Sequence, residues 1–244
     1  MTIRYLGQSG YLLKAGFTEI LIDPYLSDSV NRIAGRPRQL PIPIRPAEIH
    51  CDAVICTHSH ADHLDPDTVS EIKEPMRYLT THEGKRILSD MGTKTVRAFA
   101  TGDSVTVGNF EITAVFAAHT VEAFGLIVSA EKITLYFSGD TLFHEKLFEI
   151  ARFHPDVAFY CINGRLGNMN VREALTVAER IDAAIQIPNH YDMFASNAAD
   201  PLLFSERIKG GRVLSFDKTY SLTKQNDEPV MKEIPFHTNA PSGL

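Results

Sequence analysis

Residues 57–65 read Thr-His-Ser-His-Ala-Asp-His-Leu-Asp, and this stretch determines the fold and chemistry that we expect of the chain. It follows an apolar run over residues 53–57, which predicts a buried strand. It ends at Asp65-Pro66, which is typical of a helix N-cap followed by proline at the first helical position. We therefore expect a polar turn between a strand and a helix that extends to about Glu74.

Three histidines and one aspartate within this turn have the spacing of metal ligands. Residues two apart in an extended turn point the same way, so His58 and His60 can bind one ion. Asp62 and His63 lie at the turn into the helix and can reach a second point beside it. Imidazole and carboxylate groups suit zinc, and also manganese or iron. With 10 histidines in 244 residues, such a pattern arises by chance on the order of once in a thousand chains.

Three more potential ligands occur in a shared context, each just after an apolar run. If the three runs are strands of one orientation, their ends meet at one edge of the sheets. Any one of these residues alone would more simply be a cap or a core residue, but together with the first motif they complete two sets of ligands. They are His119 after residues 110–117, Asp140 after residues 133–137, and His190 after residues 184–188.

This set of residues resembles the metal signature of the metallo-β-lactamase superfamily: His-x-His-x-Asp-His, a single His, a Gly-Asp and a final His, in that order. The resemblance implies an α/β fold, an αββα sandwich of two mixed sheets with outer helices, in a single domain over residues 1–244. It also implies two divalent metal ions. By position, one ion would be bound by His58, His60 and His119, and the other by Asp62, His63 and His190, with Asp140 bridging them.

Asp23 ends an apolar run over residues 19–22, where this superfamily often has an acidic residue behind the metal ligands. It would orient a metal-binding histidine from behind, although a simple strand-end turn explains it nearly as well. The second half of the chain also resembles the L-ascorbate-6-phosphate lactonase branch. That likeness covers residues 163–167, 169–170, 188–194, 196–197 and 199–201.

Two ions about 3.5–4 Å apart can share a water molecule and lower its pKa toward neutrality, and the resulting hydroxide attacks an electrophilic carbon or phosphorus. Asp62 and Asp140 are the expected catalytic residues, since they can orient that water and move its proton. The leading hypothesis is therefore a metal-dependent lactonase or carboxylic-ester hydrolase. Its substrate would be a phosphorylated sugar acid or another small anion. A metal-dependent phosphodiesterase and a non-catalytic metal-binding domain remain as alternatives.

Candidate substrate-binding residues lie in the loops that follow two expected strands. Asn163 and Arg165 come after residues 156–162, and a planar guanidinium suits a phosphate or carboxylate. Tyr191 could donate a hydrogen bond to a reacting oxygen or could simply pack. Four arginines in the proline-rich segment 24–50 could add positive potential over the site or could be solvated: Arg32, Arg36, Arg38 and Arg45.

The composition favours a small-molecule enzyme. The hydrophobic fraction is 44% and the formal net charge is −6, and no basic tract suggests a nucleic-acid partner. No run approaches the roughly 20 apolar residues of a membrane helix. No secretion signal is visible at the N-terminus, so we expect a cytoplasmic protein. The three cysteines do not suggest a disulfide framework, and a homo-oligomer is left open.

Several element predictions test this scheme. Residues 170–173 resemble a capping box that opens a helix. Residues 143–152 are expected to form a helix and residues 212–216 a last strand. The prolines of residues 24–50 make regular helix unlikely over most of that segment. The polar tail from Gln225 onward has no assigned structure.

Overall fold

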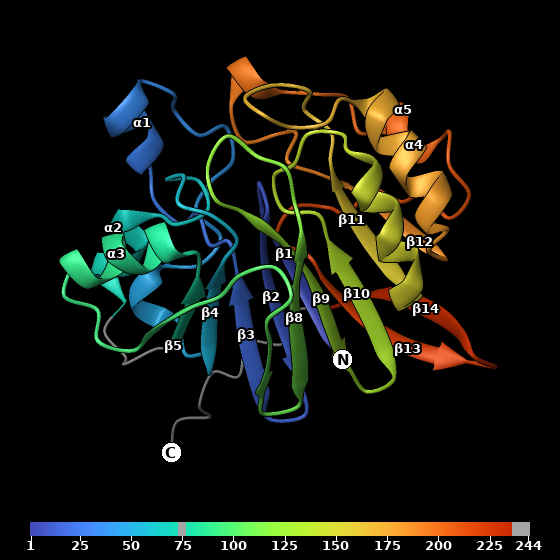
Figure 1. Cartoon of the computed structure of the whole chain (residues 1–244), viewed down its shortest axis with the longest axis horizontal. Helices are drawn as coiled ribbons and strands as arrows, with labels where there is room; N and C mark the ends of the chain where they lie inside the picture. The colour runs from blue at the N-terminus through green and yellow to red at the C-terminus, as the bar shows by residue number, and fades with distance from the viewer. Residues whose placement is uncertain (73–76, 236–244) are drawn as a thin grey trace.

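Two β-sheets form the centre of the computed structural model, which describes residues 1–72 and 77–235 (Figure 1). The first sheet has the strand order β14-β13-β1-β2-β3-β4-β5-β6. Its strands are β1 Thr2–Gly7, β2 Gly10–Ala15, β3 Thr18–Ile22, β4 Ala53–Cys56, β5 Arg77–Thr80, β6 Val96–Ala98, β13 Thr219–Gln225 and β14 Glu228–Ile234. The second sheet has the order β12-β11-β10-β9-β8-β7. Its strands are β7 Ser104–Val107, β8 Phe110–Phe116, β9 Phe124–Ala130, β10 Ile133–Phe137, β11 Val157–Cys161 and β12 Ile185–Asn189.

Helices cover the outer faces of both sheets. Figure 1 shows α2 and α3 on one side of the sheets, and α4 and α5 on the other. The expected αββα arrangement of two mixed sheets with outer helices is therefore confirmed. The helical elements are α1 Ser29–Ala34, η1 Pro46–Glu48, α2 Pro66–Glu71, α3 His82–Asp90, η2 Glu145–Phe153, α4 Val171–Ile181, η3 Ala195–Asn197 and α5 Leu202–Ser205.

The main hydrophobic core lies between the two sheets and contains side chains from both. Tyr11 of β2 illustrates the contact. Its ring centroid lies 5.2 Å from that of Phe137 in β10 and 4.9 Å from that of Phe159 in β11. Aromatic pairs at such distances add to the free energy that burial itself supplies. The sheets are thus held face to face, which fixes their edges relative to one another.

The strand orientations bring the expected ligands to one edge. β8 and β10 both run antiparallel to β9, and β10, β11 and β12 are parallel to each other. β8, β10 and β12 therefore share one direction, which meets the condition under which the sequence placed the expected ligands at one edge. Since parallel strands end on the same side of a sheet, the residues that follow these three strands lie close together.

Local capping signals from the sequence are confirmed. The Asp65 side chain accepts a hydrogen bond from the amide of Asp67 at the start of α2. Asn170 and Glu173 form the reciprocal capping box of α4. Helix α2 ends at Glu71, so the expected extension to Glu74 falls outside the described residues. Within the described ranges, no helix is long and apolar enough to cross a membrane.

One expected helix is present but is not α-helical, and one expected strand is wrong. The segment 143–152 contains a run of 3₁₀ turns, η2, in place of an α-helix. Its core-facing residues Leu147, Ile150 and Phe153 recur every third position, which matches the three-residue repeat of a 3₁₀-helix. The segment 212–216 is not a strand either. Only Gly211 bridges to β12, and the chain then leaves the ladder.

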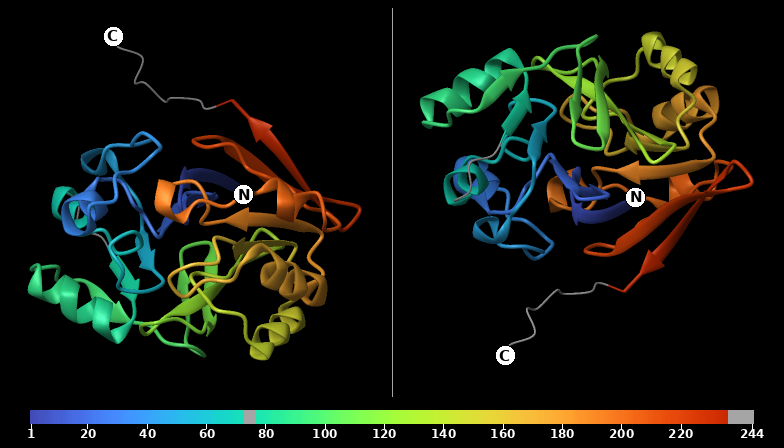
Figure 2. Two further views of the ribbon diagram at one scale, coloured as in Figure 1. Left: turned by 90° about the horizontal axis from the view of Figure 1, so that it is seen from above. Right: turned by 90° about the horizontal axis from the view of Figure 1, so that it is seen from below.

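Three strands were not expected from the sequence: β6, β13 and β14. The last two form a hairpin whose turn and second strand belong to the polar tail, in red at the rim of the molecule in Figure 2. Its turn residues Asn226 and Asp227 have φ angles of 51° and 65°. Two successive positive φ angles are typical of the tight turns that join antiparallel strands.

Candidate metal centre

The structure brings all seven expected ligands to one place. Four come from the turn between β4 and α2, and the other three follow β8, β10 and β12. Their ligand atoms form three overlapping groups in which every atom lies within 4.8 Å of the others. These groups are His58–His60–His119, His58–His63–Asp140 and Asp62–His63–His190.

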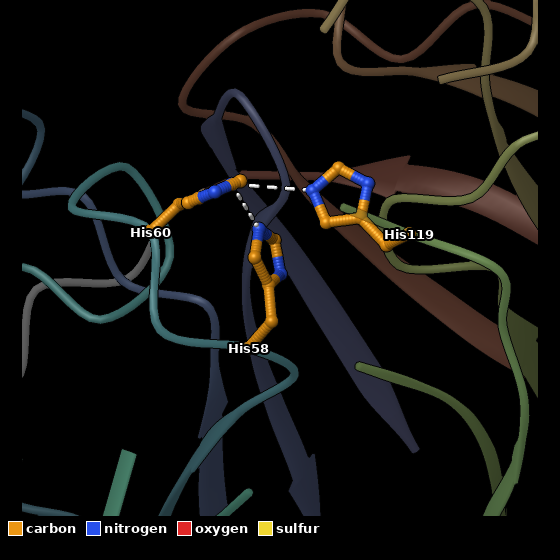
Figure 3. Close-up of side chains that lie close together, drawn as sticks. All are labelled: His58, His60 and His119. Carbon is orange, nitrogen blue, oxygen red and sulfur yellow. Dashed lines mark hydrogen bonds between the residues drawn. The ribbon is translucent and has the colours of Figure 1, made fainter. Parts of the chain in front are cut away.

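The first group consists only of imidazoles. His58 Nε2 lies 3.0 Å from His60 Nδ1, which lies 3.2 Å from His119 Nε2. Figure 3 shows the three rings close together, with dashed lines that join His60 to each of the other two. Because His60 comes from the loop after β4 and His119 from the loop after β8, this group joins the two sheets.

The group Asp62–His63–His190, called the second ligand group from here on, combines imidazoles with a carboxylate. Asp62 Oδ2 lies 3.3 Å from His190 Nε2 and 3.8 Å from His63 Nε2. His63 is fully buried and His190 is 3% exposed. Both imidazoles are thus almost inaccessible to solvent, whereas the Asp62 side chain is 17% exposed.

Asp140 lies between the His58–His60–His119 group and the Asp62–His63–His190 group. Its Oδ2 atom is 3.2 Å from His190 Nε2 and 4.0 Å from both His58 Nε2 and His119 Nε2. Its Oδ1 atom is 3.3 Å from His63 Nε2. This is the place that the resemblance implied for a bridging carboxylate.

Asp23 supports the second group from behind. Its carboxylate accepts hydrogen bonds from the Thr57 amide at 2.7 Å and the Thr57 hydroxyl at 2.8 Å. Oδ2 also lies 2.9 Å from His63 Nδ1. A proton on Nδ1 leaves Nε2 of His63 free to face the centre, so the contact fixes the ring and its tautomer.

The loop after β11 supports the first group and Asp140. The Gly167 carbonyl lies 3.0 Å from His119 Nδ1 and can accept its proton, which directs Nε2 toward the centre. The Asn168 amide donates to Asp140 Oδ2 at 2.9 Å. Neither contact was expected, because the sequence placed Asn168 in this loop without indicating which way its side chain points.

The residues of the centre fit divalent cations. His63 Nε2 and Asp140 Oδ1 are buried and have no hydrogen-bond partner among the described residues. Leaving such atoms unpaired costs free energy, and a cation between them removes that cost. Imidazole and carboxylate donors suit zinc and manganese alike, so the donor set is compatible with either ion.

The histidines of the two groups differ in electrostatic environment. Burial lowers the pKa of His58 well below its usual value and also lowers the pKa of His119. Burial acts the same way on His63, but Asp140 and neighbouring carboxylates outweigh it and raise the pKa of His63 well above normal. The same balance raises the pKa of His190 to about 9.

A pocket of about 360 Å³ opens over the centre. His60, Asp62, Asp140 and His190 line its inner part. The outer walls come from α1, the residues just after it and the loops after β4, β8, β11 and β12. They consist of Val30, Ile33, Ala34, Arg36, Ala61, Thr120, Leu166, Phe194 and Asn197.

The expected substrate residues lie elsewhere. Arg165 is exposed, Tyr191 is buried in the core under α4, and neither lines the pocket. Asn163 is buried and donates a hydrogen bond to Asn197 Oδ1 at 2.7 Å, so it contacts the pocket wall from behind. Other residues of the same loops, Leu166 and Asn197, line the pocket instead.

The arginines of segment 24–50 have different roles. Arg32 pairs with Asp67 at 2.5 Å, and Arg45 pairs with Glu48. Arg38 donates to backbone carbonyl groups of its own segment. Arg36 lines the pocket and makes no ion pair within the described part of the chain.

Gln8 is a further residue of the centre that the sequence did not indicate. It is 1% exposed, and its Nε2 atom donates to Asp62 Oδ2 at 2.7 Å. It comes from the short connection between β1 and β2. Gly7 and Gly10 flank it, and a polar residue between glycines at a strand end was the one available signal.

Comparison with known proteins shows the same architecture. Residues 18–191 match the family model described as the beta-lactamase superfamily domain. A UPF0173 metal-dependent hydrolase of Methanospirillum hungatei is 30% identical over 221 residues, covering 85% of this chain and 90% of that protein. One of Oenococcus oeni is 28% identical over 239 residues, covering 90% and 99%.

Solved structures share the fold at lower identity. An isothiocyanate hydrolase from Delia radicum gut bacteria superposes with a TM-score of 0.77 at 19% identity, covering 91% of this chain and 99% of that one. A possible metal-dependent hydrolase from Veillonella parvula gives a TM-score of 0.76 at 20% identity, covering 90% and 98%. At these identities the likeness shows the fold alone.

Proposed function

The chain belongs to the beta-lactamase superfamily, among its UPF0173 metal-dependent hydrolases, and from this premise we propose that it hydrolyses an ester or lactone bond in a small anionic substrate. The observation that carries the proposal is the convergence of seven ligand side chains at the bottom of a pocket. Divalent cations bound there supply a Lewis acid and lower the pKa of water.

The two pocket-lining carboxylates are the groups that can handle a proton. Asp62 and Asp140 both face the pocket. Hydrogen bonds and nearby histidines keep the pKa of each carboxyl below its usual value, against the opposing effect of burial. Each is therefore ionised near neutral pH, so each can accept a hydrogen bond from an attacking water and orient it. Asn168 fixes the orientation of Asp140 through its amide.

Arg36 is the side chain that favours an anionic substrate. It is half-buried in the pocket wall, and its guanidinium makes no ion pair with the described residues, whereas Arg32 and Arg45 are paired. A guanidinium binds a carboxylate or phosphate through parallel hydrogen bonds. We assign Arg36 the role of binding the anionic group of the substrate.

The rest of the pocket wall favours a substrate with an apolar body. Val30, Ile33, Leu166 and Phe194 line it, and Ile33 and Leu166 are 58% and 57% exposed. A ligand that covers apolar side chains and removes them from water binds more tightly as a result. Thr120 and Asn197 are the polar neutral side chains of the wall, which is few for the hydroxyls of a sugar. The resemblance to the lactonase branch in the second half of the sequence therefore favours a lactone or ester bond in the substrate. It does not favour a sugar as the body of that substrate.

The apolar wall also favours a second candidate function, hydrolysis of a small uncharged electrophile. An isothiocyanate is such a compound, and a protein named as an isothiocyanate hydrolase shares this fold. Water adds to the central carbon of the substrate in that reaction. An uncharged substrate would not need Arg36, so this residue separates the two candidates.

A substrate panel with matched variants tests the proposal. We would measure kcat/KM of the zinc-loaded and manganese-loaded protein on four classes of compound. These are lactones bearing a carboxylate or phosphate, neutral lactones of equal size, small isothiocyanates and phosphodiesters. We expect turnover of anionic lactones. Arg36→Ala should lower their kcat/KM by roughly 10- to 100-fold, the effect of losing a charged hydrogen bond.

The control variant is Arg45→Ala, because Arg45 lies in the same segment but pairs with Glu48 at the surface. It should leave all rates unchanged. Turnover of neutral compounds only, unaffected by Arg36→Ala, would favour the uncharged substrate. Turnover of phosphodiesters only would move the attack from carbon to phosphorus, and no turnover of any class would favour a non-catalytic metal-binding domain.

A further inference from the structure

Gln8 occupies an unusual position beside the second ligand group, Asp62–His63–His190. Its backbone φ is 54°, and the residue that faces it, His190, has a φ of 60°. The Gln8 carbonyl accepts a hydrogen bond from the His190 amide at 3.2 Å. Residues other than glycine rarely adopt positive φ angles, and residues strained in this way cluster at functional sites. The backbone thus fixes Gln8 directly against one potential ligand.

The Gln8 side chain reaches the ligand atoms themselves. Its Nε2 atom lies 2.7 Å from Asp62 Oδ2 and 2.9 Å from His190 Nε2. These two atoms belong to the second ligand group. The carboxamide therefore lies at hydrogen-bond distance from two of the three side chains that could bind one ion.

This arrangement cannot persist when His190 Nε2 binds a cation. A ring nitrogen has one lone pair, and a nitrogen that gives it to a metal cannot accept a hydrogen bond from Gln8. A carboxamide that turns by 180° exchanges its nitrogen for an oxygen at nearly the same place. The Oε1 atom of Gln8 makes no hydrogen bond to the described residues, so the turn breaks no contact of that atom.

We propose that Gln8 is a member of the metal centre and that its carboxamide oxygen is a neutral ligand in the Asp62–His63–His190 group. An amide oxygen is a good donor to hard and borderline divalent ions. It adds no charge to a centre that already holds Asp62, Asp140 and Asp23. The inference depends on the metal centre of the proposed function but not on its substrate.

Metal content measures this role without any substrate. The full-length protein would be stripped of metal, reloaded with zinc and dialysed, and its zinc counted per chain by elemental analysis. We expect two ions in the parent and one in Gln8→Ala. Competition with a chelator should show the second ion bound roughly 10- to 100-fold more weakly in the variant, the range seen when a supporting group of a metal site is lost.

Two further variants separate a ligand from a hydrogen-bond donor. Gln8→Glu keeps an oxygen but removes the N–H that contacts Asp62, so it should retain two ions. Gln8→Asn withdraws the amide by one methylene and tolerates a positive φ, so it should lose the second ion with little effect on folding. Gln39→Ala is the matched control, because Gln39 is exposed and lies outside the metal centre.

Cobalt(II) provides a direct spectroscopic test. Replacing an oxygen ligand changes the visible absorption of cobalt in the site, so the band of the second ion should change in Gln8→Asn but not in Gln39→Ala. Two ions held with parental affinity in Gln8→Ala would overturn the proposal. So would loss of the second ion in Gln8→Glu, because the N–H would then be the essential group. If the parent holds one ion yet hydrolyses the panel substrates, the role of Gln8 fails while the proposed function stands.

Discussion

The two ligand groups share one pocket but create different environments for the same type of side chain. In the group His58–His60–His119, burial lowers the pKa of His58 and His119. In the group Asp62–His63–His190, carboxylates outweigh burial and raise the pKa of both histidines. Burial thus favours the neutral form of His58 and His119, whereas the second group has negative charge concentrated beside its imidazoles. We therefore expect the two groups to respond differently to substitutions.

The largest effect should follow the loss of the residue that both groups share. Asp140 contacts His190 and His63 and lies 4.0 Å from His58 and His119. Asp140→Ala removes the bridging carboxylate and a proton acceptor, so kcat/KM should fall on the order of 10³-fold. Steady-state kinetics and circular dichroism would check this result. The exposed Asp90→Ala serves as the control and should keep parental activity.

Ion binding itself should stabilise the fold strongly. A ligand at 100 times its Kd adds about 2.7 kcal/mol per site to the free energy of unfolding. For a chain of this size that corresponds to a rise in Tm of roughly 5–10 °C for one site. A thermal melt with zinc, reversed by a chelator, measures the shift. In His60→Ala, which leaves the second group intact, part of the shift should remain. If His60→Ala removed the whole rise in Tm, the two ligand groups would not bind their ions independently.

A smaller and more selective effect is expected behind the second group. Asp23→Asn keeps the size of the side chain but weakens its contact with His63 Nδ1. Groups that orient a metal-binding histidine typically change metal affinity by 10- to 100-fold. Chelator competition should show the loss for one ion and parental affinity for the other. If both ions weaken equally, Asp23 acts on the whole fold and does not distinguish the groups.

The smallest effect concerns the orientation of Asp140. Asn168→Ala removes one amide hydrogen bond to Asp140 Oδ2. A hydrogen bond to a charged group contributes about 1.5 kcal/mol or more, so kcat/KM should fall about tenfold. The double variant with Asn168→Ala and Asp140→Ala shows whether the effects of the two substitutions add. Effects that do not add would mean that Asn168 acts through Asp140, whereas additive effects would mean a separate role.

The sequence was sufficient to predict that these seven side chains converge because each follows an element with a clear pattern. The turn of residues 57–65 has ligand spacing of its own, and His119, Asp140 and His190 each follow an apolar strand. Parallel orientation of β8, β10 and β12 then brings their ends together. Local patterns thus predicted a long-range arrangement because the strands are short, apolar and clearly bounded.

Other parts could not be predicted, and the reasons are physical. Gln8 reaches Asp62 across 54 positions of the chain, a contact that depends on how two loops meet. The run 212–216 is apolar because Leu214 packs in the core, and burial alone does not make a strand. In η2, the three-residue repeat of buried side chains is close to the α-helical period and was read as one. The pocket side chain Arg36 could not be separated from its three arginine neighbours without knowing their partners.

The origin of the ligands has a consequence for how the protein acquires its ions. Four ligands come from the turn after β4, in the first sheet, and three from loops of the second sheet. An unfinished polypeptide that ends before His190 holds at most an incomplete set. Each ligand group combines residues from loops of both sheets, so metal binding at either group requires the two sheets to have packed together.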